Sequence, residues 1–284
     1  MKRLSFLVLI AIVAAAHADE PAAFSLRVTG TGPAMILIPG LASPGEVWSS
    51  TVEHYQSRYT CHVLTLAGFA GQPSIKTPLI ETARQQLASY IRANKLDHPI
   101  IVGHSLGGFL ALDLAASEPD LVGPIISVDG VPFLPALMNP SATAESAARQ
   151  AEGMRVAITK QSPEEFAAHN RRSLTMMITR REDVERMAAA GAKSDPRAVG
   201  DATAELMSSD LRPAMSKIRV PVLLIGAGGW ARPGMRDRLA AAYEAQIASV
   251  PKHRFVLAEK ARHFIMLDDP EFLFATIDAF LESK

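Results

Sequence analysis

The sequence predicts an α/β protein whose sheet is mostly parallel and doubly wound. Short apolar runs, each closed by glycine or proline, recur along the chain and alternate with segments of helical period. These runs do not alternate strictly between apolar and polar residues, which is typical of strands buried on both faces of a parallel sheet. The composition, 48% apolar and 20% charged, supplies enough apolar side chains for one sizeable core.

Seven strands and three clear helices are expected in this series. The strands are predicted at 25–30, which suits an edge, and then at 34–40, 61–68, 99–105, 124–130, 221–228 and 254–259. Helices are predicted at 81–96, 108–119 and 270–283, the last with Pro270 in its first turn, where proline is tolerated. Strands and helices in this order form a βαβ series.

One connection is much longer than the others. About ninety residues without a strand pattern separate Asp129 from Val220, and seven of the eleven methionines lie within 131–215. For any one methionine two interpretations stay open: helical core, or the wall of an adaptable apolar pocket under a lid. The domain division expected from this pattern is a core at 19–130 and 216–284 with a helical cap at 131–215.

The first residues of the chain have the pattern of a signal peptide. Lys2 and Arg3 precede a mostly apolar run that ends at Ala16, and an A-x-A site ends at Ala18. As a helix this run would reach only about 20 Å, less than the roughly 30 Å of a bilayer core. We therefore expect residues 1–18 to be removed, the protein to be exported to the periplasm or beyond, and the mature chain to have no membrane span.

Charge and cysteine content narrow the possible partners. Lysine plus arginine number 29, as do aspartate plus glutamate, so a zero formal charge gives no reason to expect nucleic acid. Cys61 is the single cysteine, which excludes an intrachain disulfide, and its apolar surroundings indicate a small core residue. The histidines lack the spacing of metal ligands, so neither a metal nor an organic cofactor is predicted.

The residues VGHSLGG at 102–108 join a predicted strand to a predicted helix. Within them, residues 103–107 match the pattern G-x-S-x-G. A serine on such a sharp turn has a strained backbone and an exposed hydroxyl, and the two glycines let neighbouring backbone pass closely. With a strand before it and a helix after it, Ser105 is predicted to be a nucleophile rather than a turn residue.

Three separated segments resemble the α/β-hydrolase family: LIPGLASPGEVW, VGHSLGG and ARHFIMLDDPEFL. The resemblance extends over essentially all of the mature sequence. It implies the family's fold, a hydrolytic activity and a helical cap inserted after what the family counts as strand six. A serine hydroxyl needs a base, and the resemblance gives His263, on the loop after the last strand. His253 is a weaker alternative, and His104 occupies the variable position of the motif.

The acid that orients the base departs from the commonest family pattern. That pattern has an aspartate shortly after strand seven, but this chain has no acid there until Asp237, which the pattern places in a helix. Some members carry the acid at the end of strand six, where PIISVDG supplies Asp129. The base needs a carboxylate to fix its tautomer. We favour Asp129 as this carboxylate, and the alternatives are Asp237, Asp210 or no acid at all.

Two backbone amides are expected to stabilise the oxyanion. One belongs to Leu106, the residue after the nucleophile, and the other lies on the loop after the third strand. IPGLASPG resembles the family's His-Gly-x turn with Pro39 in place of the histidine, which gives the amide of Leu41. Trp48, nearby in sequence, is expected either at a pocket wall or in the core.

The expected function is therefore that of a secreted serine hydrolase acting on small carboxylic esters, with an apolar acyl group favoured by the methionines of the cap. A lactonase, an aminopeptidase-like amidase or a C–C hydrolase would use the same triad, because the fold does not determine which type of bond is cleaved. A ligand-binding receptor on a hydrolase scaffold is the alternative from a different class. The sequence does not indicate an oligomeric state.

Overall fold

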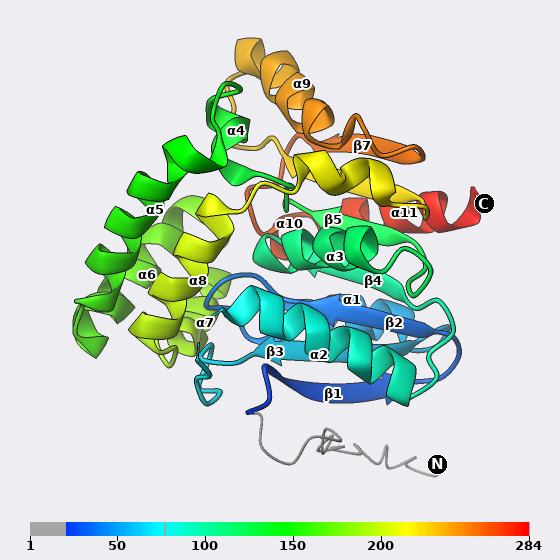
Figure 1. The fold of residues 1–284 in the computed structure, drawn as a ribbon, viewed down its shortest axis with the longest axis horizontal. Coiled ribbons are helices and arrows are strands. Elements are labelled where there is room, and N and C mark those ends of the chain that lie inside the picture. The colour runs from blue at the N-terminus through cyan, green and yellow to red at the C-terminus, as the bar shows by residue number, and fades with distance from the viewer. Residues whose placement is uncertain (1–20, 77, 284) are drawn as a thin grey trace.

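A computed structural model describes residues 21–76 and 78–283 (Figure 1). The predicted signal peptide at 1–18 and its cleavage site after Ala18 lie outside the described residues. One seven-stranded sheet crosses the described part of the molecule, with strand order β1-β3-β2-β4-β5-β6-β7. β1 is antiparallel to β3, and the other neighbouring pairs are parallel. The predicted fold class is confirmed.

The strands occur where the sequence predicts them, with ends that differ by a few residues. They are β1 (Phe24–Gly30), β2 (Ala34–Ile38), β3 (Thr60–Leu66), β4 (Ile100–His104), β5 (Ile125–Val128), β6 (Val222–Ala227) and β7 (His253–Ala258). Parallel neighbours require crossover connections, and helices supply them.

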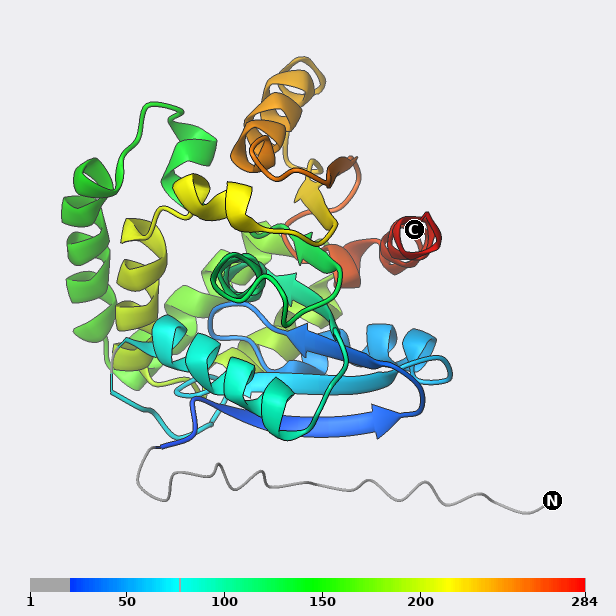
Figure 2. The ribbon, with the colours of Figure 1, turned by 45° about the vertical axis from the view of Figure 1, so that its right-hand side comes forward.

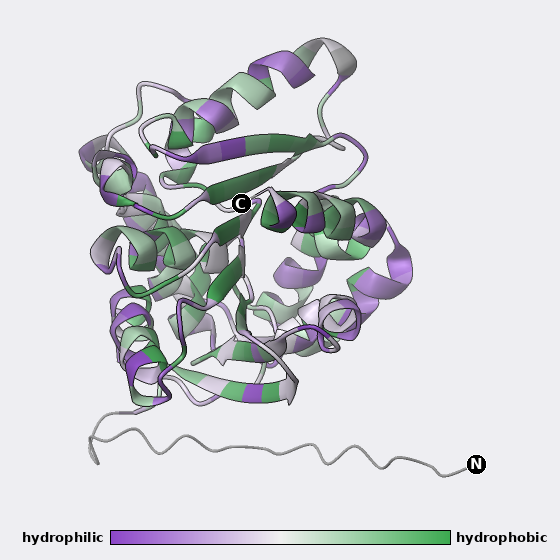
Figure 3. Ribbon diagram, turned by 90° about the vertical axis from the view of Figure 1, so that its right-hand side faces the viewer, coloured by the Kyte–Doolittle hydropathy of each residue, from purple (hydrophilic) through white to green (hydrophobic). Residues whose placement is uncertain are grey.

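Helices cover both faces of the sheet (Figure 2). One face carries α2 (Leu79–Ala93), α3 (Leu106–Ser117) and α9 (Arg236–Ile247), and the other carries α1 (Ser49–Tyr55), α10 (Ile265–Asp268) and α11 (Pro270–Glu282). The sequence of β2 is apolar throughout because both of its faces are buried. Ile36 and Ile38 enter one apolar layer, while Met35 and Leu37 enter the other. The central strands are accordingly mostly green in the hydropathy view of Figure 3.

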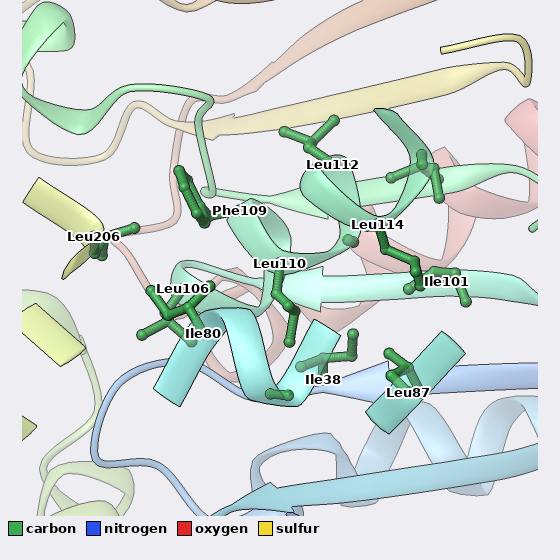
Figure 4. Packing of buried hydrophobic residues seen from close by; sticks show 14 of the residues in the cluster. Ile38, Ile80, Leu87, Ile101, Leu106, Phe109, Leu110, Leu112, Leu114 and Leu206 are labelled. Atoms are coloured by element: carbon green, nitrogen blue, oxygen red, sulfur yellow. The ribbon is translucent and has the colours of Figure 1, made fainter. Parts of the chain in front are cut away.

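Helix α3 lies deep in the first of these layers. Its residues Leu110 and Leu114 are fully buried, and Figure 4 shows them among side chains from α2, β2 and β4. Burying one such side chain contributes about 1.5–3 kcal/mol. The first turn of α3 follows β4 directly, so this packing holds the strand-to-helix junction rigidly in place.

Five helices lie between β5 and β6, inside the segment predicted as a cap. They are α4 (Leu134–Met138), α5 (Ala144–Thr159), α6 (Pro163–Met177), α7 (Arg181–Gly191) and α8 (Pro196–Ser208). Capping boxes begin two of them, with Thr143 before α5 and Ser162 before α6. In this chain the insertion follows the fifth described strand. The insertion is expected after strand six because the family's numbering counts β5 of this chain as strand six.

In Figure 1 the inserted helices stand together at one end of the sheet, beside the carboxyl ends of the parallel strands. Ligands of open α/β sheets bind at this edge. The fold therefore places the ends of β4 and β5 opposite α6 and α8.

Candidate active site

Ser105 occupies the junction between β4 and α3. Its φ of 54° and ψ of −117° are unusual for a residue with a side chain. Its N–H donates to the carbonyl of Val128 at 2.9 Å, so the strained turn is tied to the end of the neighbouring strand β5. The predicted sharp strand-to-helix turn is present.

The two glycines of the motif are needed for close backbone packing. A Cβ atom at Gly103 would lie 2.1 Å from the carbonyl oxygen of Gly107. A Cβ atom at Gly107 would lie 2.3 Å from the carbonyl oxygen of Ile38 in β2. Both distances are far below van der Waals contact. The spacing of G-x-S-x-G in this chain therefore reflects the space available around the turn.

Asp129 and His263 are joined by a hydrogen bond. Nδ1 of His263 lies 2.6 Å from Oδ2 of Asp129, and the carboxylate side chain is only 8% exposed. An ionised carboxylate can only accept, so the proton of a neutral imidazole lies on Nδ1. Nε2 of His263 is then left with a lone pair that can accept a proton.

The other carboxylate oxygen of Asp129 is held by two donors. Oδ1 accepts from the N–H of Ala227 at 3.0 Å and from the hydroxyl of Tyr243 at 2.5 Å. Burial, and next the charge of Asp129, raise the pKa of Tyr243 well above its usual value, so this hydroxyl stays protonated as a donor. The three contacts fix the plane of the carboxylate. Tyr243 lies on α9, far along the chain, and no motif marks it in the sequence.

The alternative residues lie elsewhere. Asp237 is exposed in the first turn of α9, and Asp210 pairs with Arg212 at 2.6 Å. His253 begins β7, where its Nδ1 donates to the carbonyl of Val250 at 2.7 Å. None of these three residues lines the cavity that contains Asp129.

Two further residues belong to the core. Trp48 is fully buried in an apolar cluster and is absent from the cavity wall, so the core interpretation holds for it. Burial raises the pKa of the Cys61 thiol to about 11, which keeps it protonated at neutral pH. Cys61 is therefore a core residue, as expected.

Ser105, Asp129 and His263 all line one cavity of about 510 Å³. Across the described ranges, no hydrogen bond joins the hydroxyl of Ser105 to His263. Catalytic hydrogen bonds are often long in unliganded enzymes and shorten when substrate binds. The cavity brings the predicted nucleophile, base and acid to the same space, at the ends of β4 and β5 and on the loop after β7.

The two expected oxyanion donors flank Ser105. Leu106 is the first residue of α3, so its N–H has no acceptor within that helix. Leu41 lines the cavity in a turn where Ala42 has a φ of 52° and Ser43 N–H donates to the carbonyl of Gly40. A Cβ atom at Gly40 would lie 3.1 Å from Cβ of Ser105. This turn therefore packs directly against the serine.

His104 has a role that the sequence did not indicate. It is 1% exposed, and its Nε2 donates to the backbone carbonyl of His263 at 3.0 Å. The two imidazole rings lie 4.6 Å apart. Burial, and next the charge of His263, hold the pKa of His104 well below its usual value. His104 is thus a neutral donor that fastens the His263 loop beside the serine. The motif shows a histidine here but not what it contacts.

The rest of the cavity wall is mainly apolar and comes from the inserted helices. α4, α5, α6 and α8 supply leucine, isoleucine, valine, phenylalanine and methionine side chains, and Phe264 completes the wall. Exposed apolar residues that also line the cavity stand at its rim: Leu134, Met176, Met177 and Trp230. No lysine or arginine is among the described residues that line it.

The described residues contain neither a membrane-spanning helix nor a cluster of metal ligands. No helix in 21–76 or 78–283 is long and apolar enough to cross a membrane. No group of three or more histidine, cysteine, aspartate or glutamate side chains in those ranges is arranged to hold a metal ion.

A model of the alpha/beta hydrolase family matches residues 35–276. The chain belongs to this family. The match contains all three segments on which the resemblance rests, as well as the inserted helices. The predicted family is therefore confirmed.

Individual curated relatives share about a quarter to a third of their residues with this chain over the matched length. A pimeloyl-[acyl-carrier protein] methyl ester esterase from Vibrio atlanticus is 31% identical over 114 residues, which cover 40% of this chain and 43% of that protein. The enzyme of the same name from Nitrosomonas europaea is 24% identical over 91% of this chain and 99% of its own length. The solved structure of an esterase from Exiguobacterium antarcticum has a TM-score of 0.75 at 14% identity, covering 91% of this chain and 95% of the other. At that identity the structural likeness shows the fold alone.

Proposed function

We propose that this chain is a serine hydrolase that cleaves carboxylic esters through an acyl-enzyme on Ser105. The observation that carries the proposal is the 2.6 Å hydrogen bond between Asp129 and His263, in the cavity that also contains the strained serine turn. A buried acid, an oriented imidazole and a serine that lines the same cavity are the three parts of a nucleophilic triad. Family membership and ester-hydrolysing relatives support the same reaction.

In the first half of the reaction, Oγ of Ser105 attacks the ester carbonyl while Nε2 of His263 takes its proton. The carbonyl oxygen becomes an oxyanion that accepts from the amides of Leu41 and Leu106. Asp129 stabilises the imidazolium that has formed. The C–O bond then breaks, and His263 returns the proton to the departing alcohol. The acyl group stays on Ser105.

In the second half, water replaces the alcohol. His263 takes a proton from the water as its oxygen attacks the acyl carbon, and the same two amides hold the oxyanion. The bond to Ser105 breaks, and the serine recovers its proton from His263. The products are one carboxylic acid and one alcohol, and the reaction as written consumes only the ester and one water.

The cavity wall supports an uncharged acyl group. Its apolar lining favours burial of hydrocarbon, and the described lining residues include no lysine or arginine that would pair with a distal carboxylate. A cavity of about 510 Å³ is also of the size that accepts small molecules. We propose small esters with a largely apolar acyl chain as substrates.

The nucleophile is tested by the substitution Ser105→Ala. We expect kcat for p-nitrophenyl esters to fall by about 10⁴-fold or more, and labelling by a fluorophosphonate probe to disappear. The circular dichroism spectrum and melting temperature serve as controls for folding. A variant that retains a tenth of the wild-type kcat would contradict the assignment.

The bond type is tested on a panel of alkyl esters, lactones, aminoacyl amides and vinylogous C–C substrates, because one triad serves all of them. We expect the highest kcat/KM for esters. Labelling of Ser105 without turnover of any of the compounds would support a receptor instead.

We also propose that the protein is exported and that residues 1–18 are removed. The proposal rests on the charged start, the short apolar run and the site at Ala18. Mass spectrometry of the protein from its native host should find Asp19 at the N-terminus. A soluble chain that begins at Met1 would contradict it.

A further inference from the structure

Three polar side chains interrupt the apolar wall of the cavity. His169, Asn170 and Ser173 lie on α6 at the spacing that places residues on one side of a helix, and all three line the cavity. Their neighbours on the same side, Phe166 and Leu174, are buried apolar residues. A wall that only had to contact hydrocarbon would continue that apolar pattern through these three positions.

These polar groups are not used by the protein itself. Among the described residues, none forms a hydrogen bond with the side chains of His169, Asn170 or Ser173. His169 is exposed and Asn170 and Ser173 are half-buried, and of the three side chains it is Asn170 that has a buried polar atom without a partner, Nδ2. Thr203 of α8 gives the contrast, because it lines the same cavity but its hydroxyl donates to the carbonyl of Val199 at 2.7 Å. A buried polar group without a partner is costly, so a group that satisfies it on binding is favoured.

The position of Asn170 relates these groups to the serine. A Cβ atom at Gly191 of α7 would lie 2.4 Å from Nδ2 of Asn170 and 3.1 Å from the carbonyl oxygen of Ala42. The Asn170 amide therefore lies on the side of the cavity next to the turn that contains Leu41 and Ala42. Gly191 leaves room for that amide. A substrate group that reaches Asn170 would consequently be close to the reacting carbonyl.

We propose that the polar face of α6, formed by His169, Asn170 and Ser173, is a subsite for a neutral hydrogen-bonding group of the acyl chain, such as a hydroxyl or keto group at the second or third carbon. This inference rests on the proposed ester hydrolysis and specifies its substrate class. The group is neutral because the described wall offers amide, hydroxyl and imidazole groups but no arginine or lysine. The remainder of the acyl chain contacts the apolar wall.

The test compares methyl esters that differ only by a hydroxyl in place of a methyl group. One pair is methyl 3-hydroxybutanoate and methyl 3-methylbutanoate, the other is methyl 2-hydroxypropanoate and methyl 2-methylpropanoate, and monomethyl succinate represents a charged acyl group. We expect the wild-type protein to favour the hydroxyl ester of at least one pair by about tenfold in kcat/KM. Monomethyl succinate should be the poorest substrate.

Asn170→Leu removes the amide but keeps the size of the side chain. It should reduce the hydroxyl-over-methyl ratio by about tenfold, while the methyl-branched esters are hydrolysed as before or faster. Ser173→Ala should reduce the ratio by a smaller factor, and it remains informative if Asn170→Leu fails to fold. Thr203→Val is the matched control, because its hydroxyl is already bonded. It should change both members of a pair by the same factor.

The outcomes separate this inference from the function on which it rests. Equal rates within both wild-type pairs, a preference for monomethyl succinate, or a ratio that Asn170→Leu and Ser173→Ala leave unchanged would overturn the subsite but not the esterase. Turnover of no ester at all would overturn the proposed function, and the subsite with it.

Discussion

The ends of the central strands and the inserted helices meet at the same cavity, but they contribute different chemistry. The core side presents the hydroxyl of Ser105 on a turn held by a backbone hydrogen bond, and the imidazole of His263 bonded to the carboxylate of Asp129, which also accepts from the N–H of Ala227. The side formed by α4–α8 presents apolar groups and the polar face of α6. In the proposed function, the core would perform the bond cleavage and the insertion would select what is cleaved.

The two regions also differ in how they are held. Strands β4, β5 and β6 are joined by continuous parallel ladders, and helices pack on both faces. The inserted helices are connected to the core in part by polar contacts at single residues. Glu205 of α8 accepts from the N–H groups of Ile80 and Glu81 at the start of α2, at 3.0 Å each, and Asp268 accepts from the N–H of Thr179 at 2.8 Å. Substitutions in the insertion should therefore disturb selectivity more readily than they disturb the triad.

The largest expected effect in the triad beyond the nucleophile is that of Asp129→Asn. We expect kcat to fall by about 10²–10⁴-fold, because an amide cannot replace the charge that steadies the protonated His263, and it favours the wrong tautomer. KM should change much less. Steady-state kinetics on a p-nitrophenyl ester measure both values.

Asp237→Asn is the matched control, since Asp237 is exposed in α9 and does not line the cavity. It should leave kcat within about twofold. If the two substitutions lowered kcat equally, the acid would not be Asp129, and the division between core and insertion would lose its main support.

Ser105 and Asp129 could be predicted from sequence because they directly follow β4 and β5, and His263 because the family resemblance gives it on the loop after the last strand. In a parallel sheet the carboxyl ends of neighbouring strands share one edge, so residues at those ends come together. Tyr243 could not be predicted in this way, because its contact with Asp129 depends on which side of α9 faces the sheet. His104 was visible in the motif, but its partner is a backbone carbonyl, for which no sequence signal exists.

The same limit applies to the insertion. The helical pattern and the methionines predicted helices at 131–215, but not which residues of each helix would face Ser105. Met187 and Met215 are buried away from the cavity, whereas Met154, Met176, Met177 and Met207 line it. The two interpretations of a methionine, core or pocket wall, are therefore both realised. The choice depends on the relative rotation of α5 to α8, which side-chain periodicity within one helix does not determine.

A smaller effect is expected from Tyr243→Phe. The hydroxyl donates to Oδ1 of Asp129, so its removal frees the carboxylate to rotate while the bond from Ala227 remains. We expect kcat to fall by about three- to tenfold at unchanged KM, and the free energy of unfolding by about 1–2 kcal/mol. Because the pKa of Tyr243 is raised well above 10, its hydroxyl stays protonated, and the wild-type rate should show no ionisation of this group below pH 10.

Kinetics of Tyr243→Phe, together with urea unfolding, would separate positioning from stability. Loss of stability with kcat unchanged would make Tyr243 a structural residue only. Loss of kcat that is matched by a rise in KM would instead assign it to the cavity wall.

The smallest expected effect belongs to the rim of the insertion. Met176 and Met177 line the cavity but are 71% and 38% exposed, so each contributes only part of its apolar surface to a bound chain. Their joint replacement by alanine should lower kcat/KM for long acyl esters by about two- to fivefold relative to short ones, because only a long chain reaches the rim. A series of p-nitrophenyl esters from acetate to decanoate measures this ratio.

Met138→Ala is the control, since Met138 is 75% exposed on α4 and does not line the cavity. It should leave the ratio unchanged. Equal loss for acetate and decanoate in the double variant would show that these methionines support the structure of α6 and do not select the substrate. Selection by chain length would then have to come from residues deeper in the cavity, such as Met154 and Met207.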